Sequence, residues 1–554
     1  MCKRLTLAVL ALAISTSLFA SEVSVTSSRY MVVMRRMASG TSPRLVANSV
    51  GAAEHRVRRF ENAGSMAMDL TEAEAAELRR SGDVASVEPV ITIYAQSDGV
   101  SMQPTFAFQQ QEIPWGVRAV HADSVWPVTR GAGVNVAIID TGIDITHPDL
   151  AAAYAGGFNT FDSAKQPLDD YGHGTHVAGI IAAADNAFGT VGVAPGVKLW
   201  AVKVLTSDGQ GDDEHLIAAL DWVIGKKREI GGQWVVNMSL GAPGGTDALA
   251  QGVQRAVEAG ILLVAAAGNS GKEKLLFPAV YDGVISVGAV DSQLKGWSHS
   301  SYSNGLSIVA PGVDVPSTYL RDKFPVAEVE GPTQLYSGFP IAGSPMATVV
   351  APYINCGYGR VQDIPSDAAG KICVIERGPV GPNGISSGEK ARNAKEGGAV
   401  AVIIYNYDDT KNDISLLRLF SESEYDFPLT IAMTFANAQK LLNGDRGVAT
   451  ESYRYRDYGS MTGTSMATPH VAGVVALLLA LAPSSNFAQI ETTIQRTAQD
   501  VEVKGWDERT SWGVIDALAA AKLIAPAAFD PAGGSGGGQQ PQPPPVTRRR
   551  STRH

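Results

Sequence analysis

Val136-Ala-Ile-Ile-Asp140-Thr-Gly, Gly172-His173-Gly-Thr-His176 and Gly463-Thr-Ser465-Met-Ala-Thr-Pro-His470 are the segments that decide the fold. Asp140 ends an apolar run, a pattern that predicts a buried parallel strand. His173 lies between glycines, just before a predicted helix over residues 175–184. Ser465 begins a second predicted helix over residues 466–481. We expect Pro469 to lie in the first turn of that helix, where proline is tolerated.

The three segments carry residue types that work together in nucleophilic catalysis. A serine hydroxyl is a weak nucleophile, and it needs a base to take its proton and a carboxylate to orient that base. Singly, each residue also has a structural interpretation as a helix cap, a turn former or a loop residue. Jointly, the segments predict Asp140, His173 and Ser465 as catalytic residues.

In order and local context the segments resemble the subtilisin-like serine proteases, for which the order Asp, His, Ser is a known feature. The resemblance covers residues 111–524, apart from one long insertion. Further matching motifs are Pro114-Trp-Gly, His147-Pro-Asp149-Leu, Gly192-Val-Ala-Pro195, Asn237-Met-Ser239-Leu-Gly241, Ala265-Ala-Ala-Gly-Asn269, Phe277-Pro278 and Val309-Ala-Pro-Gly312. The resemblance implies a secreted serine endopeptidase that acts on proteins or peptides. The alternative is a catalytically inactive binding or adhesion protein of the same fold.

The apolar pattern predicts an α/β fold. Strands are expected at residues 134–140, 199–205, 234–239, 261–267 and 284–290, with helices that include residues 214–227 and 246–259. This alternation predicts an open, mostly parallel sheet with helices on both faces. Active sites of such sheets lie at the carboxyl ends of the strands, where Asp140 and Asn269 both follow a predicted strand.

The resemblance also implies residues of the substrate cleft. Asn269 matches the side-chain donor of the oxyanion hole, with the backbone N–H of Ser465 as the second donor. The cleft walls are expected to bind an extended peptide by strand addition. One wall is assigned to Ser239, Leu240 and Gly241, and the other to Gly209 and Gly211. The small residues Ala266 and Gly268 leave space for the side chain before the scissile bond. No acidic pair marks this space, so we expect apolar or broadly tolerated side chains there.

A structural calcium ion is a further implication of the resemblance. The residues that match the family's tight site are Gln111, Asp149 and Asn186 through side-chain oxygens, and Ala184, Phe188 and Thr190 through carbonyl oxygens. Oxygen ligands from loops suit Ca²⁺. The alternative is a loop held by ordinary hydrogen bonds.

Length and charge limit the remaining possibilities. A chain of 554 residues with 45% hydrophobic residues is too long for one ordinary domain and can bury a large core. The formal net charge is −10, and the two ends carry a small positive charge, so the central part is the acidic one. An acidic body argues against nucleic acid as a partner. We expect a monomer.

The N-terminal region predicts export. Lys3-Arg4 and the apolar run up to Ala20 form a signal-peptide pattern over residues 1–20, for which a membrane anchor is the alternative. With the signal removed, no stable membrane insertion is expected; periplasmic or cell-surface retention is the alternative to full secretion. Residues 21–102, with predicted strands at 30–34 and 84–90 and a helix at 71–78, resemble the inhibitory propeptide of subtilases. A permanent N-terminal domain is the alternative.

The catalytic domain is predicted in two parts, residues 103–318 and 458–526, around an insertion at residues 319–457. The insertion resembles a protease-associated (PA) domain, with predicted strands at 370–378 and 397–406 and a helix at 389–396. It contains Cys356 and Cys373, which form either one disulfide or two buried thiols. Residues 527–554, rich in Gly, Pro and Gln and basic at the end, predict a disordered tail.

Three residues compete for the same roles. His176 lies at a metal-binding spacing from His173, but the Glu of the zinc-protease motif is missing, so His176 is assigned to packing. His470 is assigned a structural role as well. Ser344 lies in Gly343-Ser344-Pro-Met-Ala-Thr348, which copies much of the nucleophile motif but lacks the long apolar helix.

Overall fold

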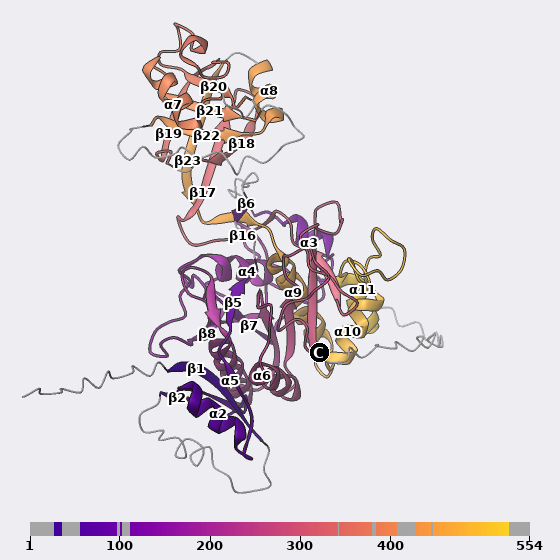
Figure 1. Ribbon diagram of the computed structural model, residues 1–554. Coiled ribbons are helices and arrows are strands. Elements are labelled where there is room, and N and C mark those ends of the chain that lie inside the picture. Colours follow the sequence, from indigo (N-terminus) through magenta and orange to yellow (C-terminus); the bar gives the residue numbers. More distant parts are fainter. Residues whose placement is uncertain are drawn as a thin grey trace, which may run out of the picture. The chain divides into compact units, whose positions relative to one another are not determined.

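The computed structural model describes residues 27–35, 56–96, 100–101, 111–341, 343–378, 384–406, 427–444 and 447–530 (Figure 1). The chain divides into two compact units. One comprises residues 1–59 and 66–89, and the other comprises residues 60–65 and 90–554. The predicted signal peptide, most of the linker after Gln96 and most of the C-terminal tail lie outside the described residues.

The first unit is a small α+β element. Its sheet has the order β2-β3-β1-β4, formed by β1 (Ser28–Met34), β2 (Val57–Phe60), β3 (Ser65–Leu70) and β4 (Val84–Pro89). Helix α2 (Glu72–Arg80) begins with a capping box, in which Thr71 and Glu74 satisfy each other's backbone N–H groups. The acidic first turn and the basic last turn complement the helix dipole. Both predicted strands and the predicted helix are therefore present.

The second unit is built on a parallel sheet of seven strands in the order β15-β14-β13-β11-β7-β9-β8 (Figure 1). The predicted α/β fold class is confirmed. The strands are β7 (Val134–Asp140), β8 (Tyr154–Asn159), β9 (Lys198–Lys203), β11 (Gln233–Met238), β13 (Leu262–Ala266), β14 (Val284–Val290) and β15 (Ile308–Pro311). All seven residues of β7 are buried, as expected of a central strand covered on both faces.

Helices cover both faces of this sheet. They are α3 (Trp115–Ala119), α4 (His173–Ala182), α5 (Asp213–Ile230), α6 (Asp247–Glu258), α9 (Thr464–Leu481), α10 (Phe487–Arg496) and α11 (Ala517–Ile524), followed by the 3₁₀ turn η2 (Pro526–Ala528). Helices α4 and α9 pack on each other and on β7, whereas α5 and α6 pair with each other. Val136 and Ile138 share one apolar cluster with α4 and α9. Since strand residues alternate between faces, Ala137 and Ile139 are buried on the other side.

Helix α9 is long and apolar enough to span a membrane, with a mean hydropathy of 1.6. However, 89% of it is buried inside the protein, as expected of the central helix of a folded core. It is the only such helix among the residues that the structure describes.

Two small antiparallel sheets flank the large one. One has the order β10-β5-β12, with β5 (Thr92–Ala95), β10 (Gln210–Asp212) and β12 (Leu240–Gly241). The other has the order β16-β24-β6, with β6 (Val100–Ser101), β16 (Val315–Thr318) and β24 (Tyr458–Met461). In the second sheet Thr318 pairs with Tyr458, so the two ends of the inserted segment meet in one strand ladder.

The inserted segment forms a closed barrel with the order β17-β18-β22-β21-β20-β19-β23. Its strands are β17 (Phe324–Glu330), β18 (Leu335–Pro340), β19 (Ala347–Asn355), β20 (Ile372–Glu376), β21 (Ala401–Tyr405), β22 (Leu429–Met433) and β23 (Val448–Arg456). Helices α7 (Ser387–Glu396) and α8 (Phe435–Asn443) and the turn η1 (Val361–Asp363) complete it. The strand predicted at residues 397–406 is shorter than expected, because Gly398 turns the chain with φ of 84°.

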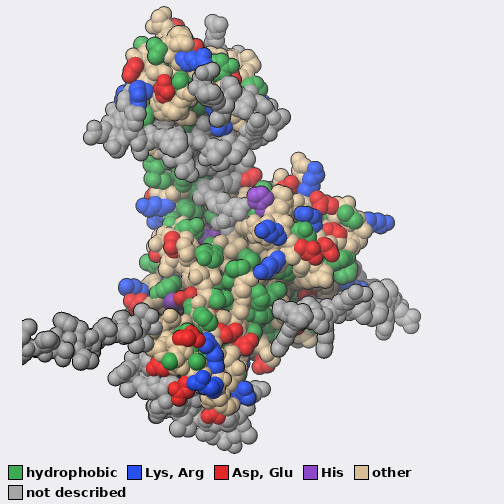
Figure 2. Space-filling model, in the orientation of Figure 1, with side chains coloured by type: hydrophobic (Ala, Val, Ile, Leu, Met, Phe, Trp, Pro, Cys, Tyr) green, Lys and Arg blue, Asp and Glu red, His purple; other side chains and the backbone are tan. Residues whose placement is uncertain are grey.

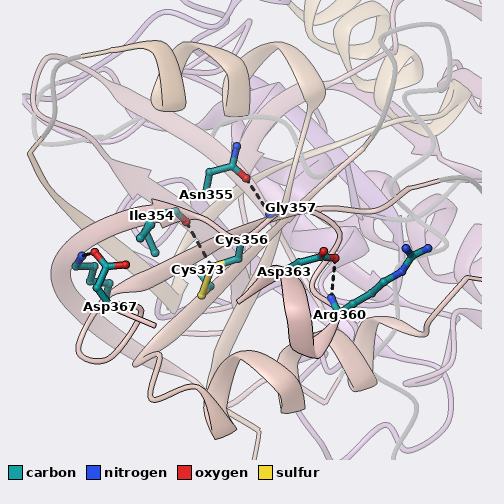
Figure 3. Close-up of a disulfide and its surroundings, with 9 residues drawn as sticks. Ile354, Asn355, Cys356, Gly357, Arg360, Asp363, Asp367 and Cys373 are labelled. Atoms are coloured by element: carbon teal, nitrogen blue, oxygen red, sulfur yellow. Dashed lines mark hydrogen bonds and ion pairs between the residues drawn. A yellow bond between two sulfur atoms is a disulfide. The ribbon is translucent and has the colours of Figure 1, made fainter. Parts of the chain in front are cut away.

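A disulfide joins Cys356, at the end of β19, to Cys373 in β20 (Figure 3). The two Cα atoms are 5.6 Å apart, within the usual range for a disulfide, and both residues are buried. Strands β19 and β20 pair in parallel beside it. The disulfide thus ties the loop 357–371 to the barrel wall. On the face that Figure 2 shows, acidic and basic side chains are interspersed over the described residues of the barrel and of the first unit.

Glu451 is a buried acid inside the barrel. It lies in β23 between Val329 of β17 and Val349 of β19, and it has no exposed surface. Neither carboxyl oxygen has a hydrogen-bond partner among the described residues. Burial raises the pKa of Glu451 well above its usual range.

This predicts a pH-dependent stability of the barrel. The unfolded chain ionises Glu451 above about pH 4.3, whereas the folded barrel keeps the proton to higher pH. Unfolding therefore releases a proton, so the free energy of unfolding falls as pH rises from about 4 through the folded pKa. Glu451→Gln keeps the size and polarity of the side chain but cannot ionise. We expect the variant to be close to the parent at pH 4 and more stable at pH 8, measured by calorimetry. Parallel pH profiles of the two proteins would contradict this.

Candidate active site

Asp140 and His173 meet at the carboxyl end of the central strand. Asp140 is the last residue of β7 and His173 is the first residue of α4. The Nδ1–H of His173 donates to Asp140 Oδ1 at 2.7 Å, and both side chains are fully buried. Asp140 Oδ1 also accepts the backbone N–H of Thr141 at 2.7 Å. The hydrogen bond fixes the imidazole ring, and Nε2 is left without a hydrogen-bond partner among the described residues.

Helix α4 begins at His173, two residues earlier than predicted, because Gly172 is its N-cap. Gly172 has φ of 105°, a conformation that side chains disfavour. A Cβ at this position would also lie 2.2 Å from the ring of Tyr319. Only glycine fits the turn that presents His173 to Asp140.

Asp169 organises the chain around His173, a role that the sequence analysis missed. Its Oδ1 accepts from the Thr141 hydroxyl at 2.8 Å and from the N–H groups of Tyr171 and Gly172 at 3.0 and 2.9 Å. Its Oδ2 accepts from the N–H and the hydroxyl of Thr175 at 2.9 and 2.6 Å. The available signal was an acidic pair, Asp169-Asp170, just before the Gly-flanked histidine.

Ser465 lies in the first turn of α9, and it exchanges hydrogen bonds with Ser239. The Ser465 hydroxyl donates to the Ser239 carbonyl oxygen at 2.9 Å, and the Ser239 hydroxyl donates to the Ser465 carbonyl oxygen at 2.8 Å. Asn237 Nδ2 donates to the Ser239 hydroxyl at 2.9 Å. The nucleophile candidate is thus tied to the segment that follows β11.

The predicted position of Pro469 is wrong: it lies inside α9 rather than in the first turn, because the helix begins at Thr464. Proline cannot donate to the carbonyl four residues earlier, which is that of Ser465. The Ser239 hydroxyl donates to this carbonyl instead. The proline is therefore tolerated because a side chain from another segment replaces the missing helix bond.

Asn269 lies beside the start of α9. Its Oδ1 accepts from the backbone N–H and the hydroxyl of Thr464 at 3.0 and 2.8 Å. The N–H of Gly268 donates to the Thr464 hydroxyl at 3.2 Å. With the oxygen fixed in this way, the amide nitrogen of Asn269 is the group that can donate elsewhere. The structure thus brings Asn269 to the residue next to Ser465.

Residues 92–96 lie between the two predicted walls of the cleft. Strand β5 pairs antiparallel with β10 on one side and with β12 on the other, so Gly211, Leu240 and Gly241 all flank it. The N–H of Ala95 donates to Gly209 O at 3.0 Å. Ile93 is fully buried, whereas Tyr94 is 43% exposed.

Gln96 lies at the candidate nucleophile. Its N–H donates to Ser239 O at 3.2 Å, and its carbonyl oxygen accepts the backbone N–H of Ser465 at 3.1 Å. Ala266 ends β13, and both it and Gly268 are buried. Gln96 cannot be recognised as a cleft residue from the sequence, because its position results from tertiary pairing alone.

The competing residues have other partners. The Nε2–H of His176, in α4, donates to the carbonyl oxygen of Gly459 at 3.1 Å, and burial, with His173 nearby, lowers the pKa of His176 to about 3. His470 Nδ1 lies 2.8 Å from Met466 O within α9, and burial lowers its pKa to about 4. The Ser344 hydroxyl accepts the N–H of Thr430 at 2.8 Å, and the chain continues into strand β19 rather than a helix.

Asp149 contacts three of the other predicted calcium ligands, Asn186, Thr190 and Ala184. Its carboxylate accepts from Asn186 Nδ2 at 2.7 Å, from Thr190 N–H at 3.1 Å and from the Tyr458 hydroxyl at 3.0 Å. The N–H of Ala184 donates to Asp149 O at 2.9 Å and that of Phe188 to Asn186 Oδ1 at 2.9 Å. The backbone N–H of Gln111 donates to the carbonyl oxygen of Ala187 in the same loop. The Gln111 side chain donates to Asp185 at 2.8 Å rather than contacting Asp149.

The fold and this site define a subtilisin-like serine endopeptidase. The sequence profile described as "Subtilase family" matches residues 131–348 and 396–513, and the profile described as "PA domain" matches residues 345–441. The chain therefore belongs to the subtilase family and carries an inserted PA domain. Both assignments made from the sequence are confirmed.

Individual relatives support the assignment. Subtilisin DY of Bacillus licheniformis is 45% identical over 214 residues, which are 38% of this chain and 76% of that protein. M-protease of Shouchella clausii is 38% identical over 263 residues, 45% of this chain and 67% of that protein. The crystal structure of the psychrophilic subtilisin-like protease Apa1 from Pseudoalteromonas matches with a TM-score of 0.57 and 31% identity, covering 76% of this chain and 99% of that one.

Asp169 is predicted to position His173. In Asp169→Ala the hydrogen bonds of Thr141, Gly172 and Thr175 to the carboxylate are lost, and such charge-assisted bonds contribute roughly 1.5–3 kcal/mol each. We expect kcat to fall by about 10- to 100-fold with a smaller change in KM, because misplacing catalytic groups slows the chemical step. Steady-state kinetics on a peptide substrate tests this, with Asp162→Ala, a surface acid, as the matched control. An unchanged kcat in Asp169→Ala would refute the positioning role.

Proposed function

We propose that this serine endopeptidase uses Asp140, His173 and Ser465 as a catalytic triad and forms an acyl-enzyme on Ser465. The observation that carries the proposal is the pairing of residues 92–96 with the cleft. Strand β5 pairs with both cleft walls, and the carbonyl oxygen of Gln96 accepts the N–H of Ser465. In this register the peptide bond after Gln96 would present its carbonyl carbon to the Ser465 hydroxyl.

The hydrogen bonds support distinct roles for the three residues. His173 Nδ1 is paired with Asp140, and His173 Nε2 is buried with no hydrogen-bond partner among the described residues. Nε2 is thus the nitrogen that would take the Ser465 proton and then give it to the leaving amine. Asp140 would hold the imidazole in that tautomer and stabilise its cation. Helix α4, which begins at His173, packs against α9, which carries Ser465 in its first turn, and this packing supports the assignment.

The tetrahedral intermediate would carry its negative charge where the Gln96 carbonyl oxygen now lies. The backbone N–H of Ser465 already donates there. Asn269 is held by its oxygen on Thr464, which leaves its amide N–H as the second donor. Each donor of this kind contributes roughly 10²- to 10³-fold in rate.

We further propose that the chain is made as a zymogen that cuts itself after Gln96. The segment 92–96 fills the cleft in the direction of a substrate, so the propeptide would act as the enzyme's own inhibitor until it is released. A second contact, outside β5, also supports inhibition by the propeptide: Asp221 Oδ1 of helix α5 accepts the N–H of Ala63 at 2.8 Å.

We also propose export by residues 1–20, with Lys3-Arg4 and the apolar run as the support.

A structural Ca²⁺ bound around Asp149 is also proposed. Asp149 is buried, its donors are the neutral groups of Asn186, Thr190 and Tyr458, and burial raises the pKa of its carboxyl group. The Thr190 hydroxyl beside it is buried without a partner among the described residues. A hard cation would bind the oxygens of Asp149, of the Asn186 side chain and of the loop carbonyls, in place of the hydrogen bonds that these groups now make. The ion would stabilise the loop and take no part in the reaction.

Substitution of the nucleophile tests the proposed mechanism. We expect Ser465→Ala to lose labelling by a fluorophosphonate probe and to remain uncut after Gln96. Ser344→Ala, the matched control in the second serine motif, should keep both properties. Gel fluorescence and intact-mass analysis of the N-terminus are the measurements. Labelling or processing that persists in Ser465→Ala would overturn the proposal.

Calcium removal tests the ion site. EDTA should lower the Tm of the parent protein, and added Ca²⁺ should restore it, because a ligand that binds only the folded state stabilises it. Asp149→Asn should abolish most of this calcium-dependent increment. Asp162→Asn, at a surface acid paired with Lys165, should keep it. A parent Tm that does not change with EDTA would argue against the site.

A further inference from the structure

The contact between the cleft and residues 91–96 extends one residue beyond strand β5. The N–H of Asp213 donates to Ile91 O at 3.1 Å, and the N–H of Ile91 donates to Asp213 Oδ1 at 3.0 Å. Within β5 the walls use backbone groups alone, whereas this last contact uses a side chain. The cleft therefore binds the chain over a longer stretch than its two wall strands, β10 and β12, cover.

The Asp213 carboxylate is fixed in place for this contact. Asp213 is the first residue of α5 and is fully buried. The Thr246 hydroxyl, at the N-cap of α6, donates to Asp213 Oδ2 at 2.7 Å, which leaves Oδ1 to Ile91. The N-cap of α5 is a different residue, Asp212, which accepts the N–H of His215 at 2.9 Å. Asp213 is thus not needed to cap its own helix.

We propose that Asp213 is a substrate-binding residue that accepts the backbone N–H of the sixth residue before the scissile bond. The inference rests on the proposed function, because Ile91 is the sixth residue when the bond after Gln96 is the one cut. The carboxylate binds a main-chain group, so it selects for the length of the substrate and not for a side chain. It favours protein chains with at least six residues before the scissile bond, and it disfavours proline at the sixth.

Two peptides isolate this hydrogen bond. The first is acetyl-Ala-Thr-Ile-Tyr-Ala-Gln-aminocoumarin, and the second carries N-methylalanine in place of the first alanine, which removes the N–H. For the processed parent enzyme we expect kcat/KM to be about tenfold higher for the first peptide, as for one hydrogen bond to a charged group. Asp213→Ala should cleave both peptides equally. Asp213→Asn, which keeps an acceptor oxygen, should retain most of the preference.

A shorter substrate provides the control. Acetyl-Thr-Ile-Tyr-Ala-Gln-aminocoumarin still presents a carbonyl at the place of Ile91 O but lacks the sixth N–H. The parent and Asp213→Ala should cleave it with similar kcat/KM, which shows that the variant is folded and that its remaining cleft is intact. Equal kcat/KM of the parent enzyme for the two six-residue peptides would overturn the proposal.

A second measurement does not depend on catalysis. In the full chain carrying Ser465→Ala, hydrogen–deuterium exchange at the Ile91 amide should be slow, and Asp213→Ala should speed it at least tenfold. Asp213→Asn should not. If no peptide is cleaved, the proposed function fails, and the exchange rate still decides whether Asp213 binds this amide. Exchange that is unchanged by Asp213→Ala would contradict the contact.

Discussion

The hydrogen bond between Asp140 and His173 is the interaction on which the active-site geometry depends. A carboxylate buried without a partner is costly, and here it is held by an imidazole at 2.7 Å and a backbone N–H. Keeping both groups in place takes a buried parallel strand, a helix that begins at His173, and Asp169, which binds three segments of the surrounding loop. These supports all come from residues 134–182, a single stretch of the chain.

Ser465, the proposed nucleophile, is held in a different way. Pro469 leaves the Ser465 carbonyl without its helix partner, and the Ser239 hydroxyl takes that place. The Ser239 carbonyl in turn accepts from both the Ser465 hydroxyl and the Gln96 N–H. Ser239 therefore contacts Ser465, in the first turn of helix α9, and Gln96 of the segment in the cleft. The helix hydrogen bond that Pro469 cannot make is what links Ser239 to the carbonyl of Ser465.

Much of this could be predicted from the sequence, and the rest depended on contacts between distant segments. The apolar run ending at Asp140 and the capped helix after Thr71 are local patterns, and both were predicted correctly. The position of Pro469 was wrong because the start of α9 is set by Gly463 and by the bond of Asn269 to Thr464, 195 residues apart. Asp169 and Asp213 were missed because acids before a helix are usually caps. Gln96 lies in the cleft only through pairing with β10 and β12.

The meeting of Thr318 and Tyr458 in one ladder has a consequence for how such a chain could arise. Loop-closure entropy grows only with the logarithm of loop length, so a long excursion costs little once its ends are paired. The barrel leaves and rejoins the catalytic unit at adjacent strands, and its apolar clusters comprise only residues of the inserted segment. A gene segment inserted at this hairpin would add a folded module without changing the register of the sheet that carries the active site.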